Sequence, residues 1–297
     1  MNTKRILTYS LVLLITMSLN AQRKTILLNN NWRFTHGYEV KRNVSERVDI
    51  PHTWNAIDAH SGKLDYYRGI GNYEKEVFID KSWSEKRLFL KFYGVNSIAN
   101  VFINGKHIGE HRGGYTAFIY ELTGKIKYGE INTIMVRANN APQLDIMPLL
   151  GDFNFYGGIY RDVELIITDK TIISPLDYAS SGVYLTQKNV TKANADVEAL
   201  VKISNPNKTS GLQLKLKVLN NASTSIEKTI NVAPDDTEIK IPFSITKPHL
   251  WNGVQDPFIY QVEVSLTDGE NINDQVNQPL GLRYYHVDPN EGFFLNG

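Results

Sequence analysis

Cysteine is absent from the 297 residues of this chain. This excludes disulfide bonds, thiolate metal ligands and thiol nucleophiles. Neither sign of charge dominates, with 32 Lys and Arg against 31 Asp and Glu, so nucleic acid is not an expected partner. Without covalent cross-links, the fold must be held together by hydrophobic cores.

Long hydrophobic runs are also missing, except near the N-terminus. Lys4 and Arg5 precede a mostly apolar stretch, residues 6–19, and the small residue Ala21 follows. The stretch is shorter than the roughly 20 apolar residues of a membrane-spanning helix and is typical of a secretory signal peptide. We therefore expect residues 1–21 to be cleaved, and the mature chain to be secreted, periplasmic or extracellular, with no membrane attachment.

The sequence lacks the 3.6-residue apolar period of helices and instead shows short alternating segments. Val101 and Ile103, for example, alternate with Phe102 just before Asn104-Gly105, a dipeptide favoured in two-residue hairpin turns. These patterns predict an all-β protein.

The strand pattern changes between Thr168 and Ser181, and the strands beyond it contain fewer aromatic residues. We place a domain boundary there and predict two domains, residues 22–172 and 173–286. About seven short strands in the second domain are typical of an immunoglobulin-like β-sandwich, and the larger first domain fits a jelly-roll β-sandwich.

Motifs for metal binding and for familiar catalytic sites are not found. His107 and His111 lie in a predicted hairpin without a His-Glu-x-x-His pattern, so we predict no metal site. Glycoside hydrolysis usually needs two carboxylates that face each other. Neither Asp152 nor Glu291, which follows Asn290 in a predicted turn, makes such a pair.

The strongest functional signal is the aromatic and polar character of "DYYRGIG" (65–71) and "GDFNFYGG" (151–158). Sugars are bound by rings that stack on their apolar faces and by charged or amide groups that contact hydroxyls. The residues alone leave two interpretations open, carbohydrate binding and simple packing of loops.

Several stretches, in order along nearly all of the mature chain, resemble the N-terminal part of family 2 glycoside hydrolases, the group of β-galactosidases, β-glucuronidases and β-mannosidases. They are "LNNNWRF" (28–34), "VDIPHTWNA" (48–56), "LKFYGVNSIANVFINGKHIGEHRGGYTAF" (90–118), "FYGGIYRDVEL" (155–165) and "LWNGVQDPFIYQVEV" (250–264). The resemblance implies a galactose-binding-like jelly-roll domain that binds sugar, followed by an immunoglobulin-like domain.

The resemblance also implies a third domain, a (β/α)8 barrel that carries both catalytic glutamates. Residues 281–297 resemble the approach to that barrel, which we expect to start at residues 287–297. A barrel needs roughly 250 residues, so we expect this chain to lack the catalytic barrel and both glutamates. We expect no cofactor in the chain itself. Mg²⁺ and Na⁺ in related β-galactosidases lie largely at barrel residues. This sequence therefore does not decide whether a full-length enzyme binds either ion.

The resemblance further implies substrate contacts. In the family, an Asp six residues before the Gly-Ile of a Gly-Ile-x-Arg motif contacts the sugar, and Asp152 has this spacing to Gly158. Arg68 lies in the other substrate-facing loop, where β-galactosidases can carry Asn. With Asn154 and Tyr156, these residues form our predicted set of substrate contacts.

The whole sequence thus favours the N-terminal two-domain portion of a secreted family 2 glycosidase, with a β-galactosidase expected first and retention of configuration implied. Two alternatives stay open, a fragment of a β-glucuronidase and a stand-alone carbohydrate-binding module without catalysis. The expected partners are a carbohydrate and the barrel domain, and the sequence does not predict an oligomeric state.

We predict that purified residues 22–297 do not hydrolyse nitrophenyl β-galactoside or nitrophenyl β-glucuronide, because the required pair of carboxylates is lacking. Release of nitrophenol is the measurement, and an Asp152→Ala variant is the control. Turnover above that of the control would contradict the prediction.

Overall fold

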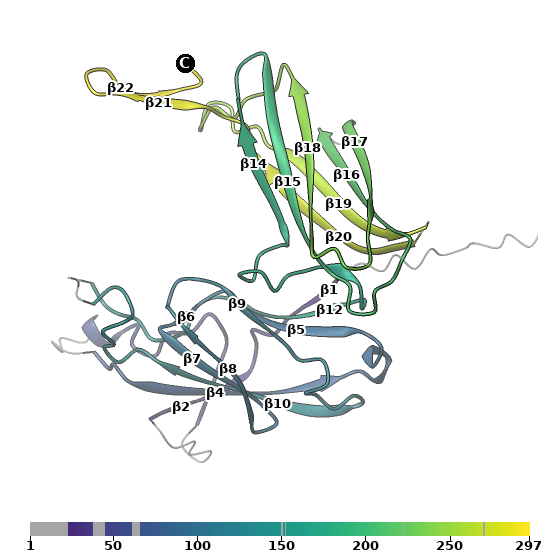
Figure 1. Cartoon of the computed structure of the whole chain (residues 1–297). Coiled ribbons are helices and arrows are strands. Elements are labelled where there is room, and N and C mark those ends of the chain that lie inside the picture. Colours follow the sequence, from purple (N-terminus) through teal and green to yellow (C-terminus); the bar gives the residue numbers. More distant parts are fainter. Residues whose placement is uncertain are drawn as a thin grey trace, which may run out of the picture.

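A computed structural model describes residues 23–37, 45–60, 66–149, 151, 153–221, 223–269 and 271–297. They form two β-sandwiches, one above the other in Figure 1, and a C-terminal hairpin. The prediction of an all-β fold is confirmed. Helical structure in these ranges consists of two short 3-10 turns, η2 (Asp58–His60) and η3 (Lys81–Trp83), and neither could cross a membrane. The predicted signal peptide lies outside the described residues.

The first sandwich pairs a four-stranded and a six-stranded antiparallel sheet. The smaller sheet has the order β1 (Lys24–Leu27), β12 (Val163–Thr168), β5 (Arg87–Phe92), β9 (Phe118–Glu121). The larger has the order β3 (Glu46–Val48), β2 (Trp32–His36), β4 (Ile70–Ile79), β10 (Glu130–Asn139), β7 (Ile98–Ile103), β8 (Lys106–Arg112). A short pair, β6 (Val95–Asn96) and β11 (Gly158–Ile159), lies beside them.

Alternation along these strands places one set of side chains between the two sheets. The largest of the fully buried side chains there are Trp32, Phe34, Tyr73 and Phe92. The predicted turn at Asn104-Gly105 joins β7 to β8, and both residues have positive φ, as a two-residue hairpin of type I′ requires.

The second sandwich is built from longer, more regular strands. One sheet contains β14 (Val183–Lys188), β15 (Asn194–Ser204) and β18 (Glu238–Thr246), with β13 (Ile172–Ile173) also paired to β15. The other has the order β17 (Ser223–Val232), β16 (Leu212–Asn220), β19 (Tyr260–Asp268), β20 (Asn271–Leu280). Its aliphatic core, including Val201, Leu214 and Val264, replaces the disulfide that many immunoglobulin-like domains contain.

Two arginines connect the sandwiches. Arg87 at the start of β5 donates to both carboxylate oxygens of Glu121 and to the hydroxyl oxygen of Ser204, 2.8 Å away, in the second sandwich. Arg23 donates to both oxygens of Asp274 at 2.8 Å, and Asp274 also accepts from the backbone N–H of Ile173. Because Asp274 is 1% exposed, this second cluster anchors β1 to the core of the second sandwich.

The C-terminal residues form the hairpin of β21 (Tyr285–Asp288) and β22 (Gly292–Leu295), which projects from the second sandwich (Figure 1). Asn290 and Glu291 lie in its turn, where their backbone N–H groups donate to Asp288 Oδ1. Glu291 is exposed there, in agreement with the turn predicted from the sequence.

Replacing Asp274 with Ala should lower the free energy of unfolding by about 3–5 kcal/mol, because Arg23 and the Ile173 N–H would lose their buried partner. Chemical denaturation followed by circular dichroism measures the change. The matched control is Asp235→Ala, which removes an exposed ion pair with Lys208 and should change stability little. Equal effects of the two variants would rule out an anchoring role for Asp274.

Candidate functional site

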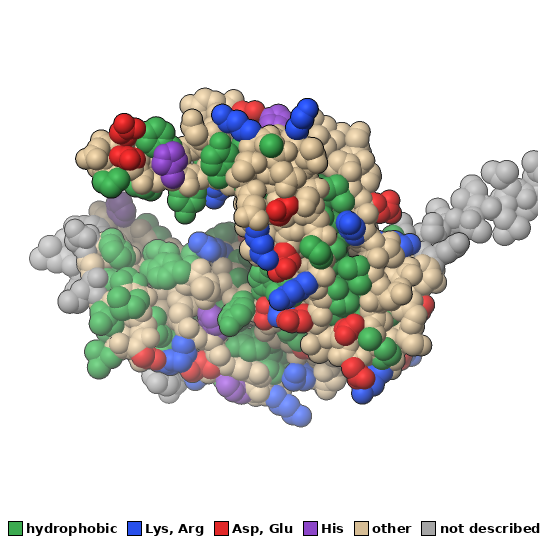
Figure 2. Space-filling view, turned by 45° about the horizontal axis from the view of Figure 1, so that its top comes forward, with side chains coloured by type: hydrophobic (Ala, Val, Ile, Leu, Met, Phe, Trp, Pro, Cys, Tyr) green, Lys and Arg blue, Asp and Glu red, His purple; other side chains and the backbone are tan. Residues whose placement is uncertain are grey.

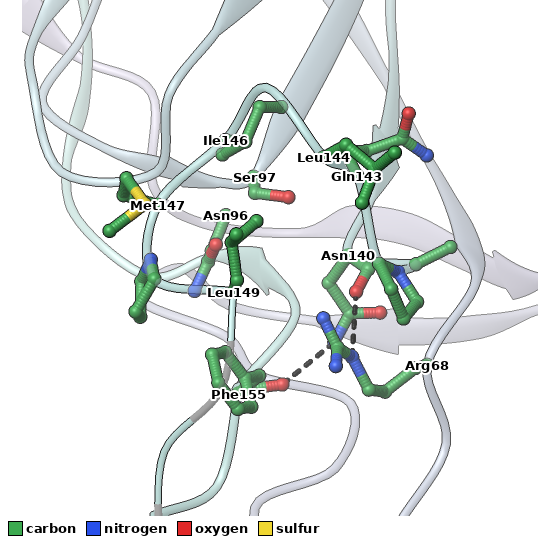
Figure 3. Close-up of a pocket in the computed structure, with 13 residues that line it drawn as sticks. Arg68, Asn96, Ser97, Asn140, Gln143, Leu144, Ile146, Met147, Leu149 and Phe155 are labelled. Carbon is green, nitrogen blue, oxygen red and sulfur yellow. Dashed lines mark hydrogen bonds between the residues drawn. The ribbon is translucent and has the colours of Figure 1, made fainter.

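A cavity of about 380 Å³ opens at one end of the first sandwich (Figure 3). Its walls come from the loop that follows β10, from the junction of β6 and β7, and from the two aromatic stretches identified in the sequence. The lining residues are Arg68, Asn96, Ser97, Asn140, Ala141, Pro142, Gln143, Leu144, Ile146, Met147, Pro148, Leu149 and Phe155.

Asn140, at the end of β10, joins the two stretches. Its side-chain oxygen accepts from the Gly69 N–H at 2.8 Å, and its Nδ2 donates to the carbonyl of Phe155 at 2.8 Å (Figure 3). Its backbone N–H donates to the Gly69 carbonyl at 3.0 Å. Asn140 is 1% exposed, so these bonds satisfy groups that would otherwise be buried without partners.

Asn55 provides a second buried connection between the same stretches. Its Nδ2 donates to the carbonyl of Phe155 at 3.0 Å and to that of Tyr67 at 3.3 Å, and its Oδ1 accepts from the Gly157 N–H at 3.0 Å. Residues about 90 positions apart in sequence are therefore held side by side by amide side chains.

Arg68 is fixed in place at the cavity wall. Its Nε donates to the carbonyl of Asn140 at 3.0 Å, and its guanidinium carbon lies 4.5 Å from the centre of the Phe155 ring, within cation–π range. In Figure 3 the guanidinium reaches across the space between Asn140 and Phe155. Among the described residues no carboxylate forms an ion pair with it.

Asn96 contributes a buried amide to the same cavity. It lies in β6, opposite Gly158 in β11, and is 4% exposed. Its Oδ1 would lie 2.5 Å from a Cβ at Gly114, so a side chain there would displace it. Burial raises the pKa of the neighbouring Tyr115, and the Asn96 amide offsets part of that rise. Apart from this approach to Tyr115, Asn96 Nδ2 makes no hydrogen bond of ordinary geometry within the described part of the chain.

A half-buried His–Tyr contact lies beside β11. The backbone N–H of His52 donates to the Ile159 carbonyl, and its Nδ1 lies 2.8 Å from the Tyr73 hydroxyl. Burial lowers the pKa of His52 and raises that of Tyr73, so both are uncharged at neutral pH. Gly158 has φ +131°, and a Cβ there would lie 2.5 Å from the His52 carbonyl oxygen. Only glycine fits this approach.

The aromatic residues near Asp152 have different surroundings. Phe153 is exposed and lies 5.2 Å from the Phe155 ring, whereas Tyr156 is half-buried and meets Tyr160 edge to face at 4.9 Å. Burial and the neighbouring Tyr156 raise the pKa of Tyr160 to about 12, and its hydroxyl donates to the Gly114 carbonyl at 2.6 Å.

The four predicted contact residues thus have different positions. Arg68 lines the cavity, while Asn154 is exposed and Tyr156 half-buried, and neither of these two lines it. Asp152 lies outside the described residues, and its role stays a prediction. Sequence reasoning missed Asn96, Asn140 and the loop of residues 141–149. The Asn-Asn-Ala-Pro run that follows an alternating strand could have indicated this loop.

No group of three or more His, Asp or Glu side chains that could hold a metal ion occurs within the described ranges. The two histidines considered in the sequence have other partners. His111 stacks on Phe118 with ring centres 4.3 Å apart, and His107 Nε2 lies 2.9 Å from Asn100 Oδ1.

Asn140→Ala should lower the free energy of unfolding by about 2–4 kcal/mol, because the Gly69 N–H and the Phe155 carbonyl would both lose their partner in a buried place. Hydrogen exchange at Gly69 should accelerate as well. The control is Asn100→Ala, which removes two exposed bonds, to Glu110 and to His107. If the two variants exchange and unfold alike, Asn140 does not hold the loops together.

The chain matches two protein-family models in succession. "Glycosyl hydrolases family 2, sugar binding domain" matches residues 18–169, and "Glycosyl hydrolases family 2" matches residues 178–283. Among solved structures, a Bacteroides uniformis β-glucuronidase superposes with a TM-score of 0.86 at 30% identity, over 93% of this chain and 34% of that one.

Curated relatives carry two enzyme names. A β-glucuronidase of Bacteroides fragilis is 58% identical over 298 residues, which is 99% of this chain and 43% of the relative. A β-galactosidase of Thermoanaerobacterium thermosulfurigenes is 30% identical over 93% of this chain and 39% of its own length. The chain thus spans less than half of these relatives, and its described residues contain no (β/α)8 barrel. The ordered matches to both family models confirm the resemblance seen in the sequence: this chain belongs to family 2 of the glycosyl hydrolases.

Proposed function

We propose that this chain supplies the sugar-binding and immunoglobulin-like domains of a secreted family 2 β-glucuronidase, and that its cavity forms part of the glycoside site. The observation that carries the proposal is the meeting of residues 66–71 with residues 153–158 at one cavity, through Asn140 and Asn55. The 58% identical β-glucuronidase supports this choice of sugar. Secretion rests on the sequence pattern of residues 1–21.

A β-galactosidase, the first expectation from the sequence, is the second candidate. The β-galactosidase that is 30% identical over most of this chain favours it. The cavity wall gives more support to a glucuronidase, because Arg68 stands where β-galactosidases can carry Asn, and a cation suits a sugar with a carboxylate.

Within the proposed enzyme, this chain would bind and orient the sugar, and would not carry out bond cleavage. Retaining hydrolysis needs two carboxylates about 5 Å apart, one as acid/base and one as nucleophile, which the barrel of the family supplies. Asp152 would accept a hydrogen bond from a sugar hydroxyl. These roles use side chains of this chain, and Mg²⁺ or Na⁺ in a full-length enzyme would lie largely at barrel residues.

The test begins with the genomic DNA downstream of codon 297. If it encodes a barrel, the complete product should cleave nitrophenyl β-glucuronide with a higher kcat/KM than nitrophenyl β-galactoside. The reverse order would favour the second candidate. DNA without barrel sequence would favour the stand-alone binding module.

In that complete product, Asp152→Asn should lower kcat/KM about ten- to a hundredfold. This is the loss expected when one charged hydrogen bond, which contributes about 1.5–3 kcal/mol, is removed from the transition state. The melting temperature should stay unchanged. Asp268→Asn, at an exposed position of the second sandwich, is the matched control. A variant at Asp152 that keeps full kcat/KM but loses stability would show that this residue only caps a turn.

A further inference from the structure

We infer that Arg68 and Asn96 form an oxyanion-binding site within the cavity, which recognises a carboxylate or a sulfate group on the bound glycoside. This inference rests on the proposed role of the cavity in glycoside binding. It adds a substrate class and the two residues that select it.

The first observation is the spare hydrogen-bonding capacity of Arg68. A guanidinium carries five N–H donors. The described residues supply one acceptor, the Asn140 carbonyl, for the donor on Nε. The two terminal nitrogens present the planar fork that matches the two oxygens of a carboxylate or sulfate. The anchored Nε and the Phe155 ring hold this fork in one orientation, so binding would cost little side-chain entropy.

The second observation is independent of the first. Asn96 is among the residues that line the same cavity and is 4% exposed, and its Nδ2, close to the Tyr115 hydroxyl, makes no hydrogen bond of ordinary geometry with the described residues. A buried donor without a partner costs roughly 1–3 kcal/mol in free energy, so a ligand that supplies an acceptor would recover it. The two donor groups therefore call for the same kind of ligand atom.

The third observation concerns the walls around these donors. Ile146, Leu149 and Phe155 supply apolar surface to the cavity, and Met147 stands exposed at its rim. Hydrophobic side chains gather at this end of the first sandwich, on the side toward which the hairpin of β21 and β22 projects (Figure 2). A charge-assisted bond is stronger where apolar walls exclude water. A neutral sugar would leave the guanidinium charge unmatched, whereas a uronic acid or a sulfated sugar would neutralise it.

The test is an NMR titration of the chain itself with three probes, methyl β-glucuronide, galactose 6-sulfate and methyl β-galactoside. We expect at least one anionic sugar to bind about tenfold or more tightly than the neutral one, with affinity that falls as salt is raised. Preference for the glucuronide would identify a carboxylate, and preference for the sulfated sugar would identify a sulfate. Equal shifts with all three sugars, or no shifts with any, would overturn the inference.

Substitutions at Arg68 and Asn96 test whether these residues cause the preference for anionic sugars. Arg68→Gln keeps a hydrogen-bonding side chain without charge and should abolish the preference for the anionic sugar. Arg68→Lys should retain part of it, and Asn96→Asp should weaken anion binding by replacing the donor with a negative charge. Arg283→Gln, which removes an exposed arginine above the Trp251 ring, is the matched control. An unchanged preference in a folded Arg68→Gln protein would contradict the proposal.

This experiment does not depend on hydrolysis. If the complete product fails to cleave glucuronides while the chain still prefers anionic sugars, the proposed function fails and the oxyanion site stands. If glucuronides are cleaved but Arg68→Gln leaves the preference intact, the oxyanion site fails and the proposed function stands.

Discussion

The hydrogen bonds of two buried amides, Asn140 and Asn55, hold together the loops that line the cavity of the first sandwich. Loops of the kind that carry Arg68 and Phe155 have backbone N–H and C=O groups that no sheet satisfies. The two amides satisfy these groups within the fold, and thereby bring together segments that lie far apart in sequence. Without these two amides, the segments that carry Arg68 and Phe155 would no longer be held together at the cavity, even if both sandwiches remained folded.

The sandwiches give these loops a rigid base. Their cores are aliphatic and aromatic side chains between antiparallel sheets, and the buried cluster of Arg23, Asp274 and Ile173 fixes one sandwich to the other. Rigid support of this kind allows irregular loops to hold binding groups in a defined geometry. The same arrangement explains the glycines at 114 and 158, where a Cβ would push into Asn96 or into the His52 carbonyl.

The cavity offers hydrogen-bond donors, a cation and apolar walls. The paired carboxylates of glycoside hydrolysis are not among its lining residues. The chain covers 43% of a β-glucuronidase relative and 34% of a solved β-glucuronidase structure, so these family 2 proteins are more than twice its length.

The sequence by itself determined the all-β class, the hairpin at Asn104-Gly105 and the family, because alternation, turn dipeptides and ordered motifs are local properties of the chain. It also singled out residues 65–71 and 151–158 as candidate sugar contacts, which stays a prediction. Only the tertiary structure decided that Arg68 lines a cavity, that Asn154 does not, and that Asn96 and Asn140 belong to the site. An asparagine in a strand has no local feature that separates a surface amide from a buried one. Its role depends on which distant backbone groups the packed sheets bring within about 3 Å of its side chain.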